Sequence, residues 1–408
     1  MTEVGILPSD WEVEYLDNVA ERKSGHTPDK KVESYWNGNI PWISLKDLSR
    51  LNKRFVSETT DYTTSEGIKN SSAVLLPMGT IVISRDATVG KIGILSKEMA
   101  TSQHFINYIC SSRLNNIYLY YYLLFKNHIF ERIATGSTIK TIGLGFFKKL
   151  KVALPPINEQ QKIASILSTW DKAIELKEKL IEQKKEQKKG LMQKLLTGEV
   201  RLPGFEGEWR EVKLGKIGKT YNGLSGKTAE DFGEGKPYIP YKTIFDDSKI
   251  NLQKLDYVKI NIGEKQNSAK KGDIFFTTSS ETPHEVGMSS VLLDDVDEIY
   301  LNSFCFGYRL NDFSVLLPNF AQHYFRSDDF RKKIYALAQG STRFNISKNE
   351  VMKIAIKIPD LKEQEGISKI LSESDKEILL LANQVRRLKE QKQGLMQLLL
   401  TGKVRVKV

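Results

Sequence analysis

Apolar side chains recur at steps of three and four residues between Ile163 and Leu196, and no proline interrupts the run. This spacing places them on one face of an α-helix. Pro155-Pro156 precedes the run, Asn158 with Gln161 resembles a capping box, and Thr197-Gly198 supplies a glycine stop. About 40 residues at 1.5 Å each predict a helix roughly 60 Å long, which must pack against another long helix.

A second copy of this pattern supplies the partner helix. Ala134–Leu202 and Ala338–Val406 align without a gap at an offset of about 204 residues, and nearly half of the aligned positions are identical. In the second copy, Asp360 with Glu363 repeats the capping signal, and an apolar stripe follows over Ile367–Leu400. The chain therefore contains an internal duplication whose constant part is mainly helical.

The segments between the helices are mixed and only faintly alike. Residues 80–84, 91–95 and 273–277 are β-branched or apolar and predict strands. Asn116–Ile133 predicts helix, and its aromatic side chains are expected in a core. We therefore expect an α+β fold in which two pseudo-twofold-related α/β modules are joined by two long antiparallel helices. The predicted division is module 1 over 1–155, spacer helix 1 over 156–198, module 2 over 199–358 and spacer helix 2 over 359–408.

Charge narrows the class of partner. The chain has 61 Lys and Arg against 50 Asp and Glu, a formal net charge of +11. This excess favours a polyanion, and nucleic acid before a membrane surface. No apolar run reaches the length of a membrane span, and the N-terminus lacks a signal pattern. Cys110 and Cys305 are expected to be buried and unpaired, which fits a cytoplasmic protein.

The motifs of the common DNA-modifying enzymes are absent from the sequence. The Pro155-Pro156 pair lacks the preceding Asn or Asp and the following aromatic residue of an adenine methyltransferase. Gly226-Lys227-Thr228 resembles the end of a phosphate loop, but Tyr221 occupies the place of its first glycine. The five histidines show no metal-ligand spacing. Asp360 and Glu363 near Lys362 loosely resemble a nuclease pattern, although helix capping explains them better. We therefore predict a chain that recognises and assembles but does not catalyse.

The repeated motifs resemble the specificity subunit of type I restriction-modification enzymes, over essentially the whole chain. Two of them, with their second copies, lie in the constant part, and two lie in the modules and are degraded in module 2. They are Pro155-Pro156-Ile157-Asn158-Glu159-Gln160-Gln161-Lys162-Ile163, Gly190-Leu191-Met192-Gln193-Lys194-Leu195-Leu196-Thr197-Gly198, Ile40-Pro41-Trp42-Ile43-Ser44 and Val89-Gly90-Lys91-Ile92-Gly93.

The resemblance implies a role in reading double-stranded DNA. Each module would be a target recognition domain for half of a split site, and the helices would fix the gap between the halves. Half-sites one helical turn apart are roughly 34–36 Å from each other. The helices would also bind two modification subunits and, in a restricting complex, motor-nuclease subunits. This chain is expected to bind no cofactor, because S-adenosylmethionine, ATP and Mg²⁺ belong to those partners.

Candidate DNA-contacting residues are those with cationic, hydroxyl or amide groups in loop-like positions. In module 1 they are Ser44, Lys46, Ser84, Arg85, Thr88, Lys91, Ser137, Thr138 and Lys140. In module 2 they are Tyr241, Lys242, Thr243, Thr277, Ser279, Ser280, Ser341, Thr342 and Arg343. Each Gly-Ser-Thr segment could equally be a plain turn.

Two further interpretations concern the helices. The run Lys184–Lys189 is expected to be a solvated helix face, and apolar residues left over from helix pairing are candidates for docking partner subunits. The partner-docking candidates are Leu191, Met192, Leu395 and Met396.

Two other functions of the whole chain stay open. One is a duplicated helical scaffold that binds other proteins and does not read a specific DNA sequence. The other is a self-contained restriction or modification enzyme, which conflicts with the missing motifs.

Overall fold

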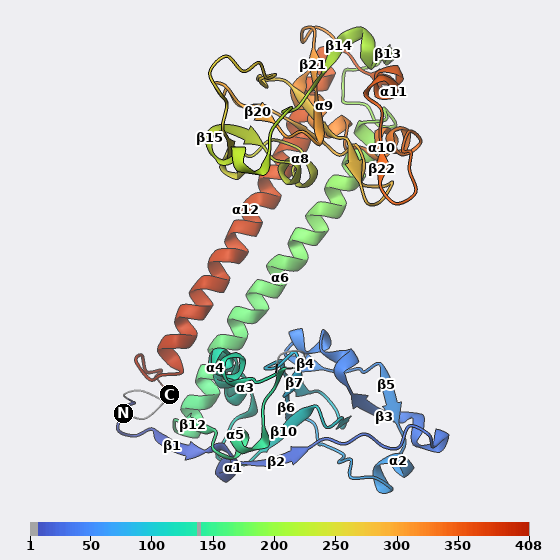
Figure 1. Ribbon diagram of the computed structural model, residues 1–408. Coiled ribbons are helices and arrows are strands. Elements are labelled where there is room, and N and C mark those ends of the chain that lie inside the picture. The colour runs from blue at the N-terminus through green and yellow to red at the C-terminus, as the bar shows by residue number, and fades with distance from the viewer. Residues whose placement is uncertain (1–6, 137–139, 408) are drawn as a thin grey trace. The chain divides into compact units, whose positions relative to one another are not determined.

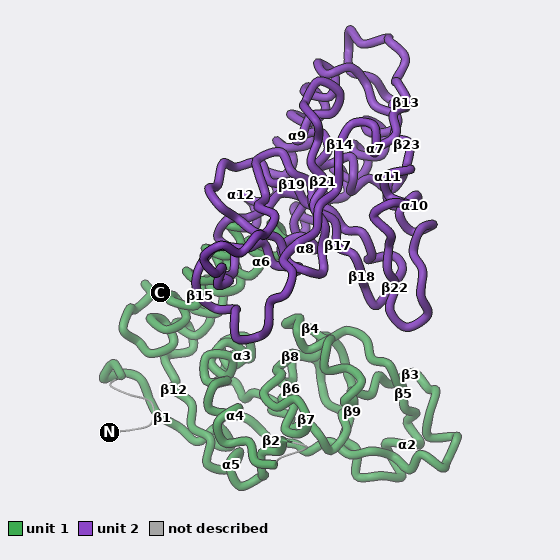
Figure 2. Tube along the Cα trace, turned by 45° about the horizontal axis from the view of Figure 1, so that its top comes forward, with its two compact units in different colours: residues 1–178, 383–408 green, residues 179–382 purple. Residues whose placement is uncertain are grey.

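The computed structural model describes residues 7–136 and 140–407, and it forms two compact units (Figure 2). Unit 1 contains residues 1–178 and 383–408, and unit 2 contains residues 179–382. The predicted division gave each long helix a segment of its own, whereas each compact unit contains one module and parts of both long helices. None of the helices among the described residues is long and apolar enough to cross a membrane.

The two long helices are α6 (Ile157–Leu195) and α12 (Leu361–Leu399), of 39 residues each (Figure 1). The carbonyl of Pro156 accepts the N–H groups of Glu159 and Gln160 at 2.9 and 3.0 Å, so α6 begins one residue before Asn158. The predicted capping role of Asn158 was therefore wrong. At α12 the prediction was correct, because the Asp360 carboxylate accepts the Glu363 N–H at 2.9 Å.

A glycine in the left-handed region follows three residues after the end of each helix, with φ of +76° at Gly198 and +69° at Gly402. A Cβ at Gly402 would lie 2.4 Å from the ring of Pro8, and one at Gly198 would lie 3.2 Å from the indole of Trp209. Glycine is thus required there both by backbone conformation and by the close approach of the following segment.

Within each unit the segments of α6 and α12 run antiparallel. In unit 1, Lys392 contacts Asp171, and Lys389 pairs with Glu178. In unit 2, Lys188 lies 2.5 Å from Asp375 and Lys184 lies 2.8 Å from Glu377. The Lys184–Lys189 run is therefore only partly a solvated face, because two of its lysines bind carboxylates of the facing helix. Exposed ion pairs stabilise little individually, whereas Lys188 and Lys392 have side chains that are only 17% and 15% exposed.

Module 1 is built on a five-stranded sheet in the order β2-β10-β6-β8-β4, with α3 and α4 packed on it. A three-stranded sheet, β5-β3-β9, forms a second lobe. The strands are β1 (Glu12–Tyr15), β2 (Ala20–Ser24), β3 (Trp36–Ile43), β4 (Phe55–Val56), β5 (Asp61–Thr63), β6 (Ile81–Ser84), β7 (Asp86–Ala87), β8 (Ile92–Leu95), β9 (Ala100–Thr101), β10 (Phe105–Cys110), β11 (Lys140–Thr141) and β12 (Lys151–Leu154). The α-helices are α1 (Leu16–Val19), α2 (Ser65–Lys69), α3 (Asn116–Phe125), α4 (Asn127–Ile133) and α5 (Leu144–Lys148).

Module 2 repeats this layout with a four-stranded sheet, β14-β21-β17-β19, and a three-stranded sheet, β16-β15-β20. The strands are β13 (Arg210–Lys213), β14 (Gly218–Asn222), β15 (Phe232–Ile239), β16 (Asp256–Val258), β17 (Ile274–Thr277), β18 (Ser279–Ser280), β19 (Ser289–Val291), β20 (Tyr300–Leu301), β21 (Cys305–Leu310), β22 (Phe344–Asn345) and β23 (Ala355–Ile358). The α-helices are α7 (Leu214–Ile217), α8 (Tyr241–Asp246), α9 (Pro318–Tyr324), α10 (Asp328–Tyr335) and α11 (Lys348–Lys353).

The cores explain the apolar patterns. The predicted core role of the aromatics in Asn116–Ile133 is confirmed for Tyr118, Tyr121, Tyr122 and Phe130, which are almost fully buried, whereas Phe125 is only partly buried against that core. Both cysteines are free. Cys305 is buried as predicted. Cys110 is only half-buried, so the prediction that it is buried was wrong.

The segments next to Gly198 and Gly402 are held by equivalent ion pairs. In unit 1 the Arg405 guanidinium binds the buried Glu159 carboxylate at 2.7 Å and Asp10 at 2.7 Å, and the Trp11 indole N–H donates to Glu159 at 3.2 Å. In unit 2, Arg201 binds the buried Glu363 at 2.7 Å. The non-covalent junction of residues 7–11 with residues 402–406 therefore repeats the continuous connector that follows α6.

Candidate DNA-recognition surfaces

A two-stranded ribbon in module 1 joins two candidate segments that are far apart in the sequence. Strand β7 follows Arg85, and β11 begins at Lys140, which pairs with Ala87. The Arg85 N–H donates to the His104 carbonyl at 2.9 Å, and the Ile142 N–H donates to the Arg85 carbonyl at 2.9 Å. We call residues 86–87 and 140–141 ribbon 1. It directly continues the central strand β6, so a packed sheet fixes its base.

The side chains at ribbon 1 are polar and partly accessible. Thr88 and Lys140 are exposed, and the Arg85 side chain is 18% exposed. The Asp86 carboxylate lies 2.9 Å from His104 Nδ1 and 3.7 Å from Arg85 Nε, and that Nε donates no hydrogen bond within the described structure. A guanidinium and an ammonium group beside a hydroxyl can together bind phosphate and base edges.

Module 2 has an equivalent feature, which we call ribbon 2: residues 279–280 of β18 and 344–345 of β22. Its frame is the same, because the Thr278 N–H donates to the Phe304 carbonyl at 2.9 Å and the Ile346 N–H donates to the Thr278 carbonyl at 3.0 Å. The preceding Ser341, Thr342 and Arg343 are exposed. Ribbon 2 thus also joins two segments that the sequence offered separately.

An aromatic side chain distinguishes ribbon 2 from ribbon 1. Phe304 is 56% exposed, and the Arg343 guanidinium lies 5.7 Å from the centre of its ring. His104 occupies the corresponding place in module 1. Sequence reasoning missed both residues. The available signal was their equivalent position, directly before the buried strands β10 and β21.

Burial removes six hydroxyl candidates from these surfaces. The Ser84 hydroxyl donates to the Thr88 carbonyl at 2.5 Å and accepts the Lys91 N–H at 2.9 Å. The Thr277 hydroxyl likewise accepts the Met288 N–H at 3.0 Å. Buried polar groups are normally satisfied in this way, so these side chains hold turns and do not face a ligand. The six buried candidates are Ser44, Ser84, Thr243, Thr277, Ser279 and Ser280.

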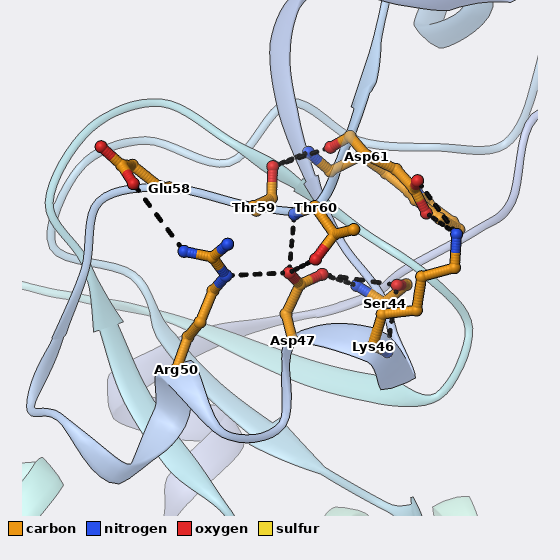
Figure 3. Close-up of polar contacts among 9 residues, drawn as sticks. Ser44, Lys46, Asp47, Arg50, Glu58, Thr59, Thr60 and Asp61 are labelled. Carbon is orange, nitrogen blue, oxygen red and sulfur yellow. Dashed lines mark hydrogen bonds and ion pairs between the residues drawn. The ribbon is translucent and has the colours of Figure 1, made fainter.

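Figure 3 shows the polar contacts that hold Ser44 against Asp47 and pair Lys46 with Asp61. Ser44 caps a short 3₁₀ helix and shares the fully buried Asp47 carboxylate with Thr60, whose N–H donates to it at 2.7 Å. The Lys46 side chain is 63% exposed and lies 2.9 Å from the Asp61 carboxylate. Of the candidates Ser44 and Lys46, only the lysine has an exposed side chain, and its ammonium is paired with Asp61.

Some of the remaining candidate side chains are exposed, and others are bound to neighbouring residues of the same module. Lys242 on α8 is 85% exposed in its side chain and lies 2.9 Å from Asp246. Tyr241 donates its hydroxyl to the Ser279 carbonyl at 2.8 Å, and Lys91 binds Asn52 at 2.5 Å, so both are half-buried supports. Two candidates, Ser137 and Thr138, lie outside the described residues.

The four partner-docking candidates pack against the cores of their own units. Leu191 and Met192 contact the core of unit 2, and Leu395 and Met396 contact the core of unit 1. They are half-buried and not left over from packing, so their docking role stays a prediction. More strongly exposed apolar side chains lie elsewhere on the helices, with Leu176 at 58% and Leu379 at 63%. Among the described residues, no group of three or more His, Cys, Asp or Glu is placed to hold a metal ion.

Comparison with known proteins identifies the family. The family model for the type I restriction modification DNA specificity domain matches twice, over residues 8–185 and 206–390. The chain therefore belongs to this family, as the resemblance predicted.

Similar proteins of this kind extend over the full length. The specificity subunit of the type I restriction enzyme MjaVIII from Methanocaldococcus jannaschii is 26% identical, and the match covers 98% of this chain and 94% of that protein. The MjaIX specificity subunit of the same organism is 35% identical, over 44% of this chain and 42% of its own length. The crystal structure of a type I restriction-modification S subunit from M. genitalium has a TM-score of 0.56 at 16% identity, with 100% of both chains covered.

Proposed function

We propose that this chain is the DNA specificity subunit of a type I restriction-modification complex, in which each module reads one part of a bipartite DNA site. One observation supports this most directly. Ribbons 1 and 2 have the same backbone frame, at the end of a buried sheet strand, but present different side chains. A constant frame with changed polar groups suits two modules that read different sequences.

The proposed reading requires a rigid spacer. We propose that the two modules are related by a pseudo-twofold axis, in line with the internal repeat and with the antiparallel helix segments of each unit. A helix of 39 residues is about 58 Å long at 1.5 Å per residue. This is enough to separate half-sites that are roughly 34–36 Å apart.

The chain is a non-catalytic subunit, so chemistry belongs to its partners. We propose that it assembles in the cytoplasm with two modification subunits and with restriction subunits. The modification subunits would carry S-adenosylmethionine, and the restriction subunits would use ATP and Mg²⁺. Exposed leucines such as Leu379 and Leu380, at 63% and 59%, give α12 an apolar surface outside its own core. A protein partner is the simplest cover for such a surface.

DNA binding by the purified complex tests the proposal. Affinity for a DNA library should fall steeply with salt, because Lys and Arg release counterions from phosphate. Selection from the library should enrich two short sequence blocks around an unread gap. Tight assembly with the protein partners but no salt-sensitive DNA binding would instead favour a protein scaffold.

A further inference from the structure

The smaller lobe of module 1 contains a corner made by two tryptophans. The Trp36 and Trp42 rings lie 4.9 Å apart, with an angle of 81° between their planes. Both indole N–H groups are tied to the backbone, Trp36 to the Asp29 carbonyl at 3.1 Å and Trp42 to the His26 carbonyl at 3.0 Å. Trp42 is 2% exposed and belongs to the core, whereas Trp36 is only half-buried. The corner is therefore fixed and open on one side.

A pocket of about 480 Å³ lies against this corner. Lys30 and Asn37 line it from the exposed side, and the Lys46–Asp61 pair lines it from the segment shown in Figure 3. The strand that carries Trp36 shifts register between Trp36 and Ile40, and Asn37 has a φ of +60°. Such a bulge redirects side chains, and asparagine is one of the few residues that adopt left-handed backbone readily.

Module 2 repeats the corner with other aromatic residues. Phe232 and Tyr238 have rings 5.3 Å apart at 65°, and their strand β15 shifts register between Phe232 and Lys236. A pocket of about 390 Å³ lies there too, but it is lined by Thr228 and Asn302 and contains no carboxylate. The aromatic walls are thus kept in both modules while the polar lining changes.

We propose that the module 1 pocket binds one nucleobase of the recognised DNA, stacked on Trp36. This inference rests on the proposed function. Any base can stack on an aromatic ring, so the aromatic walls by themselves do not distinguish one base from another. The polar residues that line the pocket, which differ between the modules, would then decide which base is bound. Both oxygens of the Asp61 carboxylate accept from Lys46 Nζ, at 3.1 and 2.9 Å, and each keeps a lone pair for a second donor. This favours a base with an exocyclic amine, which is adenine, cytosine or guanine, over thymine. Lys30 and Lys46 at the rim suit the flanking phosphates. The ring face of a paired base is covered by its neighbours, so the base bound here has left the duplex stack.

Photocrosslinking tests this with the intact chain in its complex. Binding-site DNA is synthesised with 5-iododeoxycytidine placed at one position at a time, irradiated on the protein, and the linked peptides are mapped by mass spectrometry. We expect one position to link to Trp36. Trp36→Ala should weaken DNA binding about 5- to 150-fold, the range for loss of one stacked base, while Trp36→Phe should lose much less. Tyr15→Ala, which removes a 45% exposed aromatic outside the pocket, is the matched control.

The outcomes separate the two proposals. If the wild-type complex does not bind DNA, the proposed function itself fails. If it binds DNA but no position links to Trp36, and Trp36→Ala binds as tightly as Trp36→Phe, the pocket proposal is overturned. A titration with free dCMP tests whether the pocket binds a free nucleotide and not a base of DNA. Quenching of Trp36 fluorescence by dCMP, with no crosslink from DNA, would assign the pocket to free nucleotides and would also overturn the proposal.

Discussion

Arg326 supports the α8 face of module 2, and its removal gives a quantitative prediction. Its guanidinium donates to the carbonyls of Ile244, Phe245 and Asp247 at 2.8, 3.0 and 2.8 Å, and to that of Ser289 at 2.6 Å. Three of these carbonyls lie at the C-terminal end of α8, where no helical N–H can reach them. The arginine therefore caps the helix that carries the exposed candidate Lys242.

The cost of removing Arg326 follows from two opposing quantities. Burial lowers its pKa from 12.5 to about 10, which corresponds to a burial cost of about 3 kcal/mol. Three of these contacts share the two hydrogens of Nη2, so together with the Nε–H bond they amount to about three full hydrogen bonds. At roughly 1.5–3 kcal/mol each these contribute at least about 4.5 kcal/mol, which outweighs the cost of burial. Arg326→Met should therefore lower the free energy of unfolding by at least about 1.5 kcal/mol.

Urea unfolding combined with hydrogen exchange measures this effect and locates it. In Arg326→Met, amide exchange should rise over residues 241–247. Arg331→Met is the matched control, because Arg331 donates to the carbonyls of His284, Val286 and Gly287 and not to α8. It should raise exchange over 284–288 instead. An Arg326→Met variant with the wild-type urea midpoint and unchanged exchange in α8 would refute the reasoning.

Four further predictions test other parts of the molecule. Burial lowers the pKa of His323 to about 4, so the folded state holds fewer protons than the unfolded state below pH 6.5. Stability should therefore be lost as the pH falls from about 6.5 to 4, and less so in His323→Gln, as urea midpoints will show. Lys140→Ala and Arg343→Ala should each reduce the slope of log affinity against log salt by about 1, provided that each contacts a phosphate. Gly402→Ala should destabilise by about 1–3 kcal/mol, because φ is +69° and its Cβ would clash with a proline. In calorimetry Gly190→Ala should stabilise by roughly 0.5–1 kcal/mol, since nothing lies within 4 Å of its Cβ.

The helices could be predicted because their cause is local. The three- and four-residue spacing of apolar side chains and the glycine stops at Gly198 and Gly402 lie within short stretches of sequence. The start of α6 was misplaced because Pro156 and Asn158 are both acceptable near a helix N-terminus. Only the hydrogen bonds to the Pro156 carbonyl decide between them.

The sites could be predicted only in part because they depend on long-range pairing. Ser84 and Lys140 both looked suited to DNA contact, but β6 and the β7–β11 pairing bury the serine and expose the lysine. His104 and Phe304 join the ribbons through backbone bonds to residues that precede them by 19 and 26 positions (104 − 85 and 304 − 278). Nothing in a local pattern identifies such a neighbour.

Adenine-methylation mapping tests the central claim most directly. DNA is sequenced for methyladenine from cells that express this chain with its modification subunit, and from cells that express the modification subunit alone. We expect a new split motif of two short blocks around a fixed gap. Replacing residues 199–355 with those of another specificity subunit should change only one block. The account would be contradicted if a stable complex formed and no new methylation appeared, or if the exchange changed both blocks.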